Sequence, residues 1–207
     1  SVREWYGRDA EGFQGYTAVL SSARAREPSV SPQLADLIRD TSTAEIARAT
    51  ALTELGPTLS LRTIDVLPLA LSDDDPAVRT AAVAILDRTP LNVRARLAFP
   101  MLEDPVRIVR IEAARVLAAI PPGELDGKQQ ALLDRAGNEY VAAQMASAER
   151  PEAWVNLGNF HVSRRDANSA IEAYRKAIET DSVFMPSYTN LADVYRALGD
   201  ETSAEKV

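Results

Sequence analysis

An arginine recurs in this chain every 31 residues, and two further columns follow the same interval. The three columns are Arg48, Arg79 and Arg110; Ala51, Ala82 and Ala113; and Leu55, Leu86 and Leu117. Three columns with one period indicate tandem repeats, and a repeat of this length cannot bury its apolar face alone. The period therefore predicts a stack of similar units in which each unit packs on its neighbours.

The residues inside each unit follow the helical period. Apolar side chains recur at spacings of three and four, as in Val78, Ala81, Ala82 and Ile85, and Gly56 is the one glycine between Tyr16 and Pro122. Such spacing is typical of amphipathic helices. The segment 63–71 alternates like a strand, but apolar residues continue beyond it and its flanks lack hairpin turns, so we predict a helix there as well.

Acidic residues stand where these helices should begin. Asp75-Pro76 and Asp104-Pro105 each pair a good N-cap residue with a proline, which the first helical turn tolerates. The run Asp73-Asp74-Asp75 also suggests a divalent cation site. Consecutive carboxylates diverge, however, and no glycine-bearing calcium loop is present, so we favour helix capping for this run.

Two of these units resemble the short form of the HEAT repeat. The resemblance is carried by SDDDPAVRTAAVAIL and LEDPVRIVRIEAARVL, while AEIARATALTEL is a weaker first copy. It implies that the aspartate and arginine six residues apart interact within and between neighbouring units. The expected ladder consists of Asp73, Arg79, Asp104 and Arg110, with a role in register and solubility.

A second period, of 34 residues, begins at Pro151. The first unit carries Trp154, Leu157, Gly158, Ala170, Tyr174 and Ala177, and the second carries Tyr188, Leu191, Ala192, Tyr195 and Ala204. This pattern resembles the tetratricopeptide repeat (TPR), in which small residues let two helices approach and aromatic residues fill the space between units. Ser182 and His161 depart from the pattern, and the second unit ends before its second helix is complete.

The TPR resemblance implies a concave, peptide-binding face lined by the first helix of each unit. The candidate residues are Glu152, Val155, Asn156, Asn159, Val162, Thr189, Asn190, Asp193 and Arg196. The three asparagines offer amide donors and acceptors to an extended peptide backbone. Val155 stands where carboxylate-gripping TPR proteins place a lysine, which argues against binding of a chaperone C-terminus. The alternative is that these asparagines face only solvent or neighbouring helices.

These patterns divide the chain into four parts. We expect an aromatic N-terminal capping helix over 1–30, HEAT-like repeats over 31–122, a linker helix or half TPR over 123–150, and TPR units over 151–207. The predicted fold class is all-α, a right-handed α-solenoid of helical hairpins in which the HEAT-like repeats continue into the TPR units. The capping residues would be Trp5, Tyr6, Phe13 and Tyr16, which either close the stack or form a binding patch.

Composition excludes much familiar chemistry. The chain has no cysteine and one histidine, His161, so thiolate sites, multi-histidine metal sites and cysteine nucleophiles are absent. His161 occupies a packing position, and Ser163 points to another helix face, so we interpret the imidazole as structural. We therefore expect no enzyme activity, no catalytic residue, no metal site and no cofactor within these residues.

Charge and hydropathy restrict the partners. Thirty acidic and 23 basic residues give a net charge of −7, whereas nucleic-acid-binding surfaces are basic. No segment is long and apolar enough to cross a membrane, and the first residues do not resemble a signal peptide. We expect a soluble piece of a longer protein whose partner is a protein, a peptide or another domain of the same chain. The oligomeric state is left open.

The order of segments also resembles the C-terminal region of bacterial multihaem c-type cytochrome proteins with TPR tails. The resemblance rests on WYG, the HEAT-like repeats, EYVAAQMASAERPEA and WVNLGNFHVSRRDANSAIEAYRKAIETD. It implies an exported or periplasmic parent whose haem sites lie upstream, with this region serving assembly or docking. The leading hypothesis is a non-enzymatic interaction scaffold; the cytochrome docking domain and a HEAT-like enzyme that handles a tetrapyrrole are the alternatives.

Overall fold

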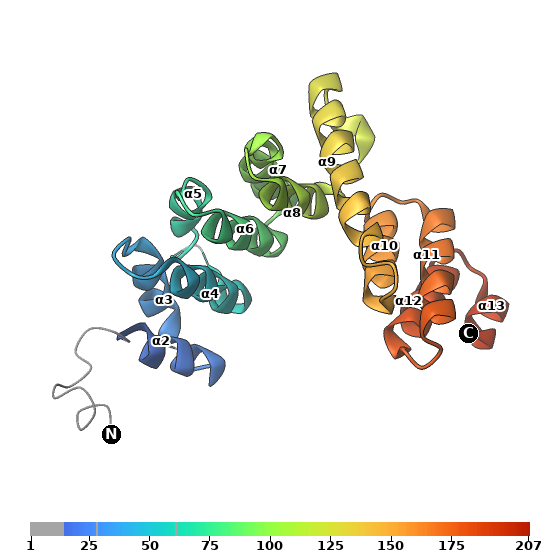
Figure 1. Cartoon of the computed structure of the whole chain (residues 1–207), viewed down its shortest axis with the longest axis horizontal. Helices are drawn as coiled ribbons and strands as arrows, with labels where there is room; N and C mark the ends of the chain where they lie inside the picture. The colour runs from blue at the N-terminus through green and yellow to red at the C-terminus, as the bar shows by residue number, and fades with distance from the viewer. Residues whose placement is uncertain (1–14, 28, 61) are drawn as a thin grey trace. The chain divides into compact units, whose positions relative to one another are not determined.

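The computed structural model describes residues 15–27, 29–60 and 62–207, and every regular element in these residues is helical (Figure 1). Trp5, Tyr6 and Phe13 of the expected capping segment lie outside the described residues, while Tyr16 is half-buried on the first described helix. The α-helices are α2 (Gly15–Arg24), α3 (Val30–Arg39), α4 (Glu45–Leu55), α5 (Val66–Leu71), α6 (Pro76–Ile85), α7 (Leu91–Ala98), α8 (Arg107–Leu117), α9 (Gly127–Met145), α10 (Pro151–Ser163), α11 (Ala167–Thr180), α12 (Met185–Ala197) and α13 (Glu201–Lys206). The predicted all-α fold is confirmed.

The chain divides into two compact units, 1–97 and 98–207. In the first unit α4 packs on α3 and α6, and α2 and α5 pack against α3. Its core consists of fully buried aliphatic residues, including Leu34, Ile38, Leu52, Leu55, Val66, Leu67, Val78 and Leu86. The helix expected over 63–71 is shorter than predicted, because turns occupy residues 62–65 and Thr63 accepts a hydrogen bond from the Ser60 amide at 3.1 Å.

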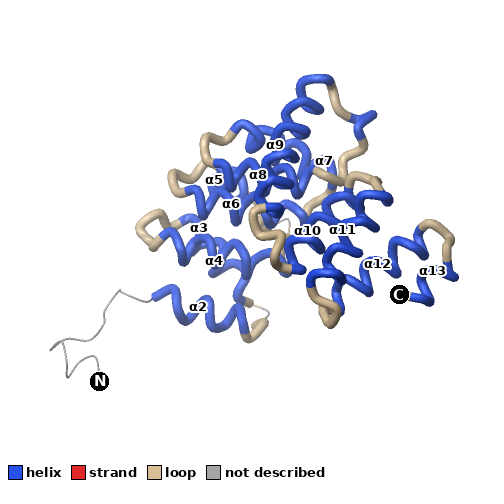
Figure 2. Tube along the Cα trace, turned by 45° about the vertical axis from the view of Figure 1, so that its right-hand side comes forward, coloured by secondary structure: helices blue, strands red, loops and turns tan. Residues whose placement is uncertain are grey.

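The second unit contains α8 to α13, and most consecutive helices pack against each other (Figures 1 and 2). Helix α8 is the third copy of the 31-residue repeat, yet its Ile111 and Ala118 share a core with Tyr140 of α9 and Phe160 of α10. Arg110 of α8 also forms an ion pair with Glu139 of α9 at 2.9 Å. A helix of the first repeat type thus packs directly on the helices that lead into the second type.

Two similar turns, 34 residues apart, precede α11 and α13. Arg165 and Gly199 both have positive φ, at 60° and 78°, and each is followed by an aspartate that caps a helix. Asp166 accepts from the Ser169 amide at 3.1 Å, and Asp200 accepts from the Ser203 amide at 3.0 Å. These caps satisfy backbone N–H groups that have no partner within the helix, so they fix where α11 and α13 begin.

Helices α10 and α11 approach closely at Gly158. A Cβ atom added at this position would lie 2.6 Å from both Cδ1 and Cζ of Tyr174, whose side chain is 2 % exposed. Glycine is therefore required here by space and not by backbone conformation. The absence of a side chain at residue 158 lets the Tyr174 ring approach the α10 backbone closely.

We predict that Gly158→Ala destabilises the second unit. The added methyl group overpacks a filled core, which typically costs about 1–3 kcal/mol and outweighs the roughly 1 kcal/mol that alanine gains in helix propensity. Chemical denaturation followed by circular dichroism measures the change. The matched control is Gly127→Ala, because a Cβ on this first residue of α9 meets nothing within 4 Å. Equal behaviour of the two variants would contradict the steric explanation.

His161 lies near the end of α10, and its ring and that of Phe160 form an edge-to-face pair with a centroid distance of 6.1 Å. Its Nδ1 is 3.8 Å from a carboxylate oxygen of Asp166. Burial lowers the pKa of His161 below its ordinary value, and the nearby Arg164 charge adds to this, while Asp166 and Glu172 act in the opposite direction. The packed imidazole is therefore held in its neutral form.

We predict that His161 makes the second unit less stable in mild acid. The unfolded chain protonates this imidazole at about pH 6.5, above the pKa in the folded state, so unfolding takes up a proton and stability falls as pH drops through this range. The measurement is the unfolding free energy from pH 8 to pH 5 for the wild type and for His161→Tyr, which carries the residue found at the equivalent Tyr195. Parallel curves would show that His161 does not contribute.

Candidate functional site

Helices α10 and α12 present three asparagines on neighbouring surfaces, which we call the asparagine face: Asn156, Asn159 and Asn190. Asn156 and Asn159 are exposed on α10, and Asn190 is half-buried on α12. The two helices contact each other directly and lie side by side in Figures 1 and 2. Helical spacing alone places Asn156 and Asn159 on one side of α10, and tertiary packing adds Asn190.

Asn159 is the centre of a hydrogen-bond network that joins three helices. Its Oδ1 accepts from the Tyr174 hydroxyl of α11 at 2.7 Å and from Asn190 Nδ2 of α12 at 3.1 Å. Burial raises the pKa of Tyr174 to about 12, although the Asn190 amide lowers it, so this hydroxyl remains a donor. The amide of Asn159 is therefore oriented by two donors, and its nitrogen is directed away from them.

Asn156 is held by a second contact. Its Nδ2 donates to Gln144 Oε1 of α9 at 3.1 Å, and its backbone oxygen accepts from the Tyr140 hydroxyl at 3.2 Å. The two tyrosines, Tyr140 and Tyr174, are 34 residues apart and both reach from a second helix to α10. The repeat pattern predicts the packing role of Tyr174 but not the contacts of its hydroxyl or of Gln144, because helical periodicity contains no signal for hydrogen bonds between helices.

The other predicted groove residues differ from the asparagines in burial and in their contacts. Val155 is 7 % exposed and belongs to the core cluster with Tyr174, so its side chain is packed, whereas Val162 is 44 % exposed. Asp193 and Arg196 form an exposed ion pair at 2.8 Å. Glu152 and Thr189 are exposed, Glu152 beside Arg150 at 3.7 Å and Thr189 donating to the Met185 carbonyl oxygen at 3.3 Å.

The asparagine face offers a specific pair of polar groups. In the hydrogen bond between the two residues Asn159 uses its Oδ1 and Asn190 its Nδ2, which leaves Asn159 Nδ2 and Asn190 Oδ1 outside this contact. One is a donor and the other an acceptor, which complements an amide group. The face can therefore bind a peptide bond or a side-chain amide without first losing an internal hydrogen bond.

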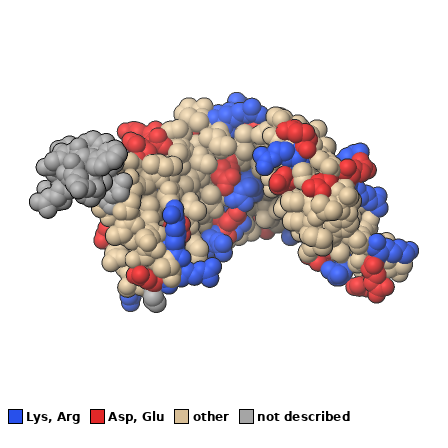
Figure 3. All heavy atoms as spheres, turned by 60° about the horizontal axis from the view of Figure 1, so that its bottom comes forward, with Lys and Arg blue, Asp and Glu red and all other residues tan. Residues whose placement is uncertain are grey.

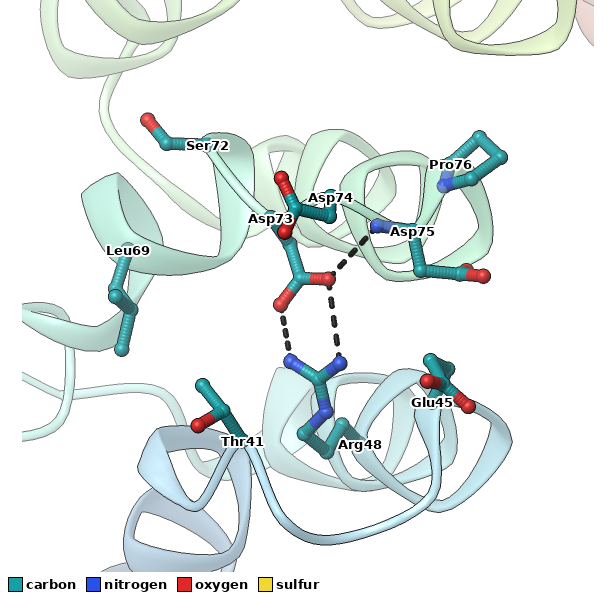
Figure 4. Close-up of a pocket in the computed structure, with 9 residues that line it drawn as sticks. All are labelled: Thr41, Glu45, Arg48, Leu69, Ser72, Asp73, Asp74, Asp75 and Pro76. Atoms are coloured by element: carbon teal, nitrogen blue, oxygen red, sulfur yellow. Dashed lines mark hydrogen bonds and ion pairs between the residues drawn. The ribbon is translucent and has the colours of Figure 1, made fainter.

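The first unit contains a hollow of about 490 Å³ above a buried ion pair (Figure 4). The Arg48 guanidinium points at the Asp73 carboxylate, and their side chains are 6 % and 8 % exposed. Arg48 Nη2 lies 3.3 Å from Asp73 Oδ1, which also accepts from the Asp75 amide at 2.9 Å. Asp75 caps α6 by accepting from the Ala77 amide at 2.7 Å, so two of the three consecutive aspartates stabilise the fold.

In the expected aspartate–arginine ladder, each arginine contacts the aspartate six residues before it through a main-chain oxygen. Arg79 donates to the main-chain oxygen of Asp73 at 2.8 Å, and Arg110 donates to that of Asp104 at 2.8 Å. The Asp73 carboxylate instead faces Arg48 of the preceding repeat, as Figure 4 shows. The Asp73 carboxylate thus bonds both to its own turn, at the Asp75 amide, and to Arg48 of the preceding repeat.

The described residues were also compared with what a charged binding patch, a metal site or a membrane-spanning helix requires. Acidic and basic side chains are interspersed over the face drawn in Figure 3. Among residues 15–27, 29–60 and 62–207, no three histidine or carboxylate side chains are placed to hold a metal ion. No helix in these residues has the length and apolar character needed to cross a membrane.

We predict that Asp73→Asn destabilises the first unit by about 3 kcal/mol. The substitution leaves Arg48 buried without its counter-charge, and breaking a buried pair is costly, while the amide oxygen can still accept from the Asp75 backbone. Thermal or urea unfolding measures the loss. The matched control in the same unit is Asp36→Asn, whose pair with Arg39 is exposed and should be worth no more than about 1 kcal/mol. Similar losses in both variants would contradict the assignment.

Comparison with known proteins agrees with the geometry of the second unit. Residues 151–183 and 186–207 match the tetratricopeptide repeat family model. The first match covers α10 and α11, and the second covers α12 and α13. No curated protein and no solved structure shows a significant match to the chain. The helices from α10 onward are therefore similar to tetratricopeptide repeats.

Proposed function

We propose that the second unit is a non-enzymatic interaction module that binds an extended segment of another protein, or of its own polypeptide, on the asparagine face. Tetratricopeptide repeats generally mediate contacts between proteins and are typically not enzymes. The observation that carries the proposal is the outward donor–acceptor pair formed by Asn159 and Asn190. This pair recognises main-chain groups, so it requires no particular side chain in the partner.

The fixed orientation of the asparagines supports this function. A flexible amide must be ordered when a ligand binds, which costs part of the interaction energy. Asn159 is already held by Tyr174 and Asn190 at 2.7 and 3.1 Å, and Asn156 is held by Gln144 at 3.1 Å. The amides of this face are therefore already ordered before the partner binds. Each new hydrogen bond then adds more to the binding free energy than a bond to a flexible amide would.

We predict that Asn159→Asp weakens peptide binding about tenfold. The carboxylate can still accept from Tyr174 and Asn190 but has no outward donor, and a lost hydrogen bond worth about 1.4 kcal/mol changes affinity by this factor. The probe is a twelve-residue peptide selected against the full chain from a random display library. Its dissociation constant is measured by fluorescence anisotropy for the wild type and the variant.

The matched control is Asn168→Asp, which makes the same chemical change at an exposed position of α11. It should leave the dissociation constant unchanged. An equal loss in both variants would point to a general charge effect, and no loss in Asn159→Asp, or no peptide selected at all, would overturn the proposed function.

A second candidate is the docking domain of an exported multihaem cytochrome, for which the order of sequence segments is the supporting observation. The fragment is then part of a longer chain, and its partner is a haem domain of the same polypeptide. The haem ligands would lie outside residues 1–207, since a c-type haem requires cysteines and the chain has none. Reading the codons upstream of Ser1 tests this candidate: repeated Cys-x-x-Cys-His motifs support it, and their absence removes it.

A further inference from the structure

The two helices of the asparagine face carry few charges. Helix α10 has one formally charged residue, Glu152, and helix α12 has two, Asp193 and Arg196. His161 of α10 adds none at neutral pH, because burial lowers its pKa. Helix α11, by contrast, carries Glu172, Arg175, Lys176 and Glu179. The asparagines therefore lie on helices that are less charged than the helix between them in the chain.

The charges beside the asparagines have counter-charges of their own. Glu152 is four residues before one asparagine and Asp193 three residues after another, so each carboxylate lies on the same side of its helix as an asparagine. Arg196 Nη1 is 2.8 Å from Asp193 Oδ1, and Arg150 Nε is 3.7 Å from Glu152 Oε2. These four groups together have no net charge.

A charged side chain of a partner gains little on such a face. Contact removes part of its hydration shell, which is unfavourable unless a counter-charge replaces the water. The acidic and basic groups of the face already have counter-charges, so a new charge would first have to separate an existing pair. A partner with uncharged contact residues does not meet this obstacle.

The exposed polar groups of the face are amides. Asn156 donates to Gln144 of α9 at 3.1 Å, and Asn190 donates to Asn159 at 3.1 Å, so hydrogen bonds between amides already form here. Each amide group has donors and an acceptor, and an amide of a partner has the same complement. Val162, three residues after Asn159 on α10 and 44 % exposed, adds an apolar contact.

We propose that the asparagine face selects an uncharged, amide-bearing segment, which contacts it through main-chain, asparagine or glutamine amides and not through acidic or basic side chains. This inference rests on the proposed function and names the class of partner for that face. Salt screens attraction between charges and has little effect on hydrogen bonds between neutral groups. Binding should therefore be insensitive to ionic strength.

The first test measures the dissociation constant of the library-selected peptide for the full chain by fluorescence anisotropy at low and at high sodium chloride. We expect a change of less than about threefold between roughly 50 and 500 mM salt, a range over which attraction between charges is strongly screened. A larger weakening at high salt would overturn the proposed partner class.

The second test replaces each contact residue of the peptide in turn by lysine and by glutamate, the contact residues being those at which alanine weakens binding. Both charges should weaken binding, because neither finds a free counter-charge on the face. Tighter binding with either charge, or a selected peptide whose contact residues are themselves charged, would overturn the proposal.

Arg196→Gln tests the role of the paired charges, because it leaves Asp193 without its counter-charge at an exposed position. The lysine-substituted peptides should then bind about threefold more tightly than they bind the wild type, as expected for an exposed ion pair. The matched control is Lys176→Gln, which removes a positive charge from an exposed pair with Glu179 on α11. No gain in Arg196→Gln, or an equal gain in both variants, would overturn this role.

The proposed function and the proposed partner class fail in different ways. A peptide that Asn159→Asp binds as tightly as the wild type contradicts the proposed function. A peptide that Asn159→Asp binds more weakly, but that high salt also releases, contradicts only the partner class.

Discussion

The contact between Gly158 and Tyr174 determines both the packing and the surface of the second unit. Because residue 158 has no side chain, the Tyr174 ring can lie against the α10 backbone, where a Cβ would be 2.6 Å from its Cδ1 and Cζ. The ring then carries its hydroxyl to the exposed side chain of Asn159, the residue that follows Gly158. The missing side chain of Gly158 in the core therefore decides how the Asn159 amide on the surface is oriented.

The first unit depends on a different interaction. Asp73 and Arg48 come from consecutive repeats, and both side chains are nearly buried. Such a pair adds little net stability over an apolar substitute, but it defines which residues must face each other, since either partner alone would be a buried, uncompensated charge. Burial of aliphatic side chains supplies the stability of this unit, and the ion pair requires Arg48 and Asp73 to face each other.

Much of the fold follows from periodicity. The 31-residue and 34-residue intervals placed the buried positions Ala51, Ala82 and Ala113 and the positions Leu157, Tyr174 and Leu191 correctly, because a residue that repeats at a fixed interval faces the same neighbour in every unit. The start of α5 was placed too early, since the hydrogen bonds of Thr63 and Ser60 hold a turn that apolar patterning cannot indicate. The packing of α8 with residues of α9 and α10 agrees with the expectation that the first repeat type continues into the second.

For the candidate site, the sequence by itself determined which residue types are present on the first helices of the 34-residue repeats, including Asn156, Asn159 and Asn190. Only the tertiary structure decided that Val155 is packed in the core and that Asn159 and Asn190 are bonded to each other. The physical reason is that helical spacing fixes the face of one helix, whereas the polarity of an amide depends on donors that other helices bring to it. Tyr174 is such a donor, 15 residues from Asn159 in the chain and 2.7 Å away in space.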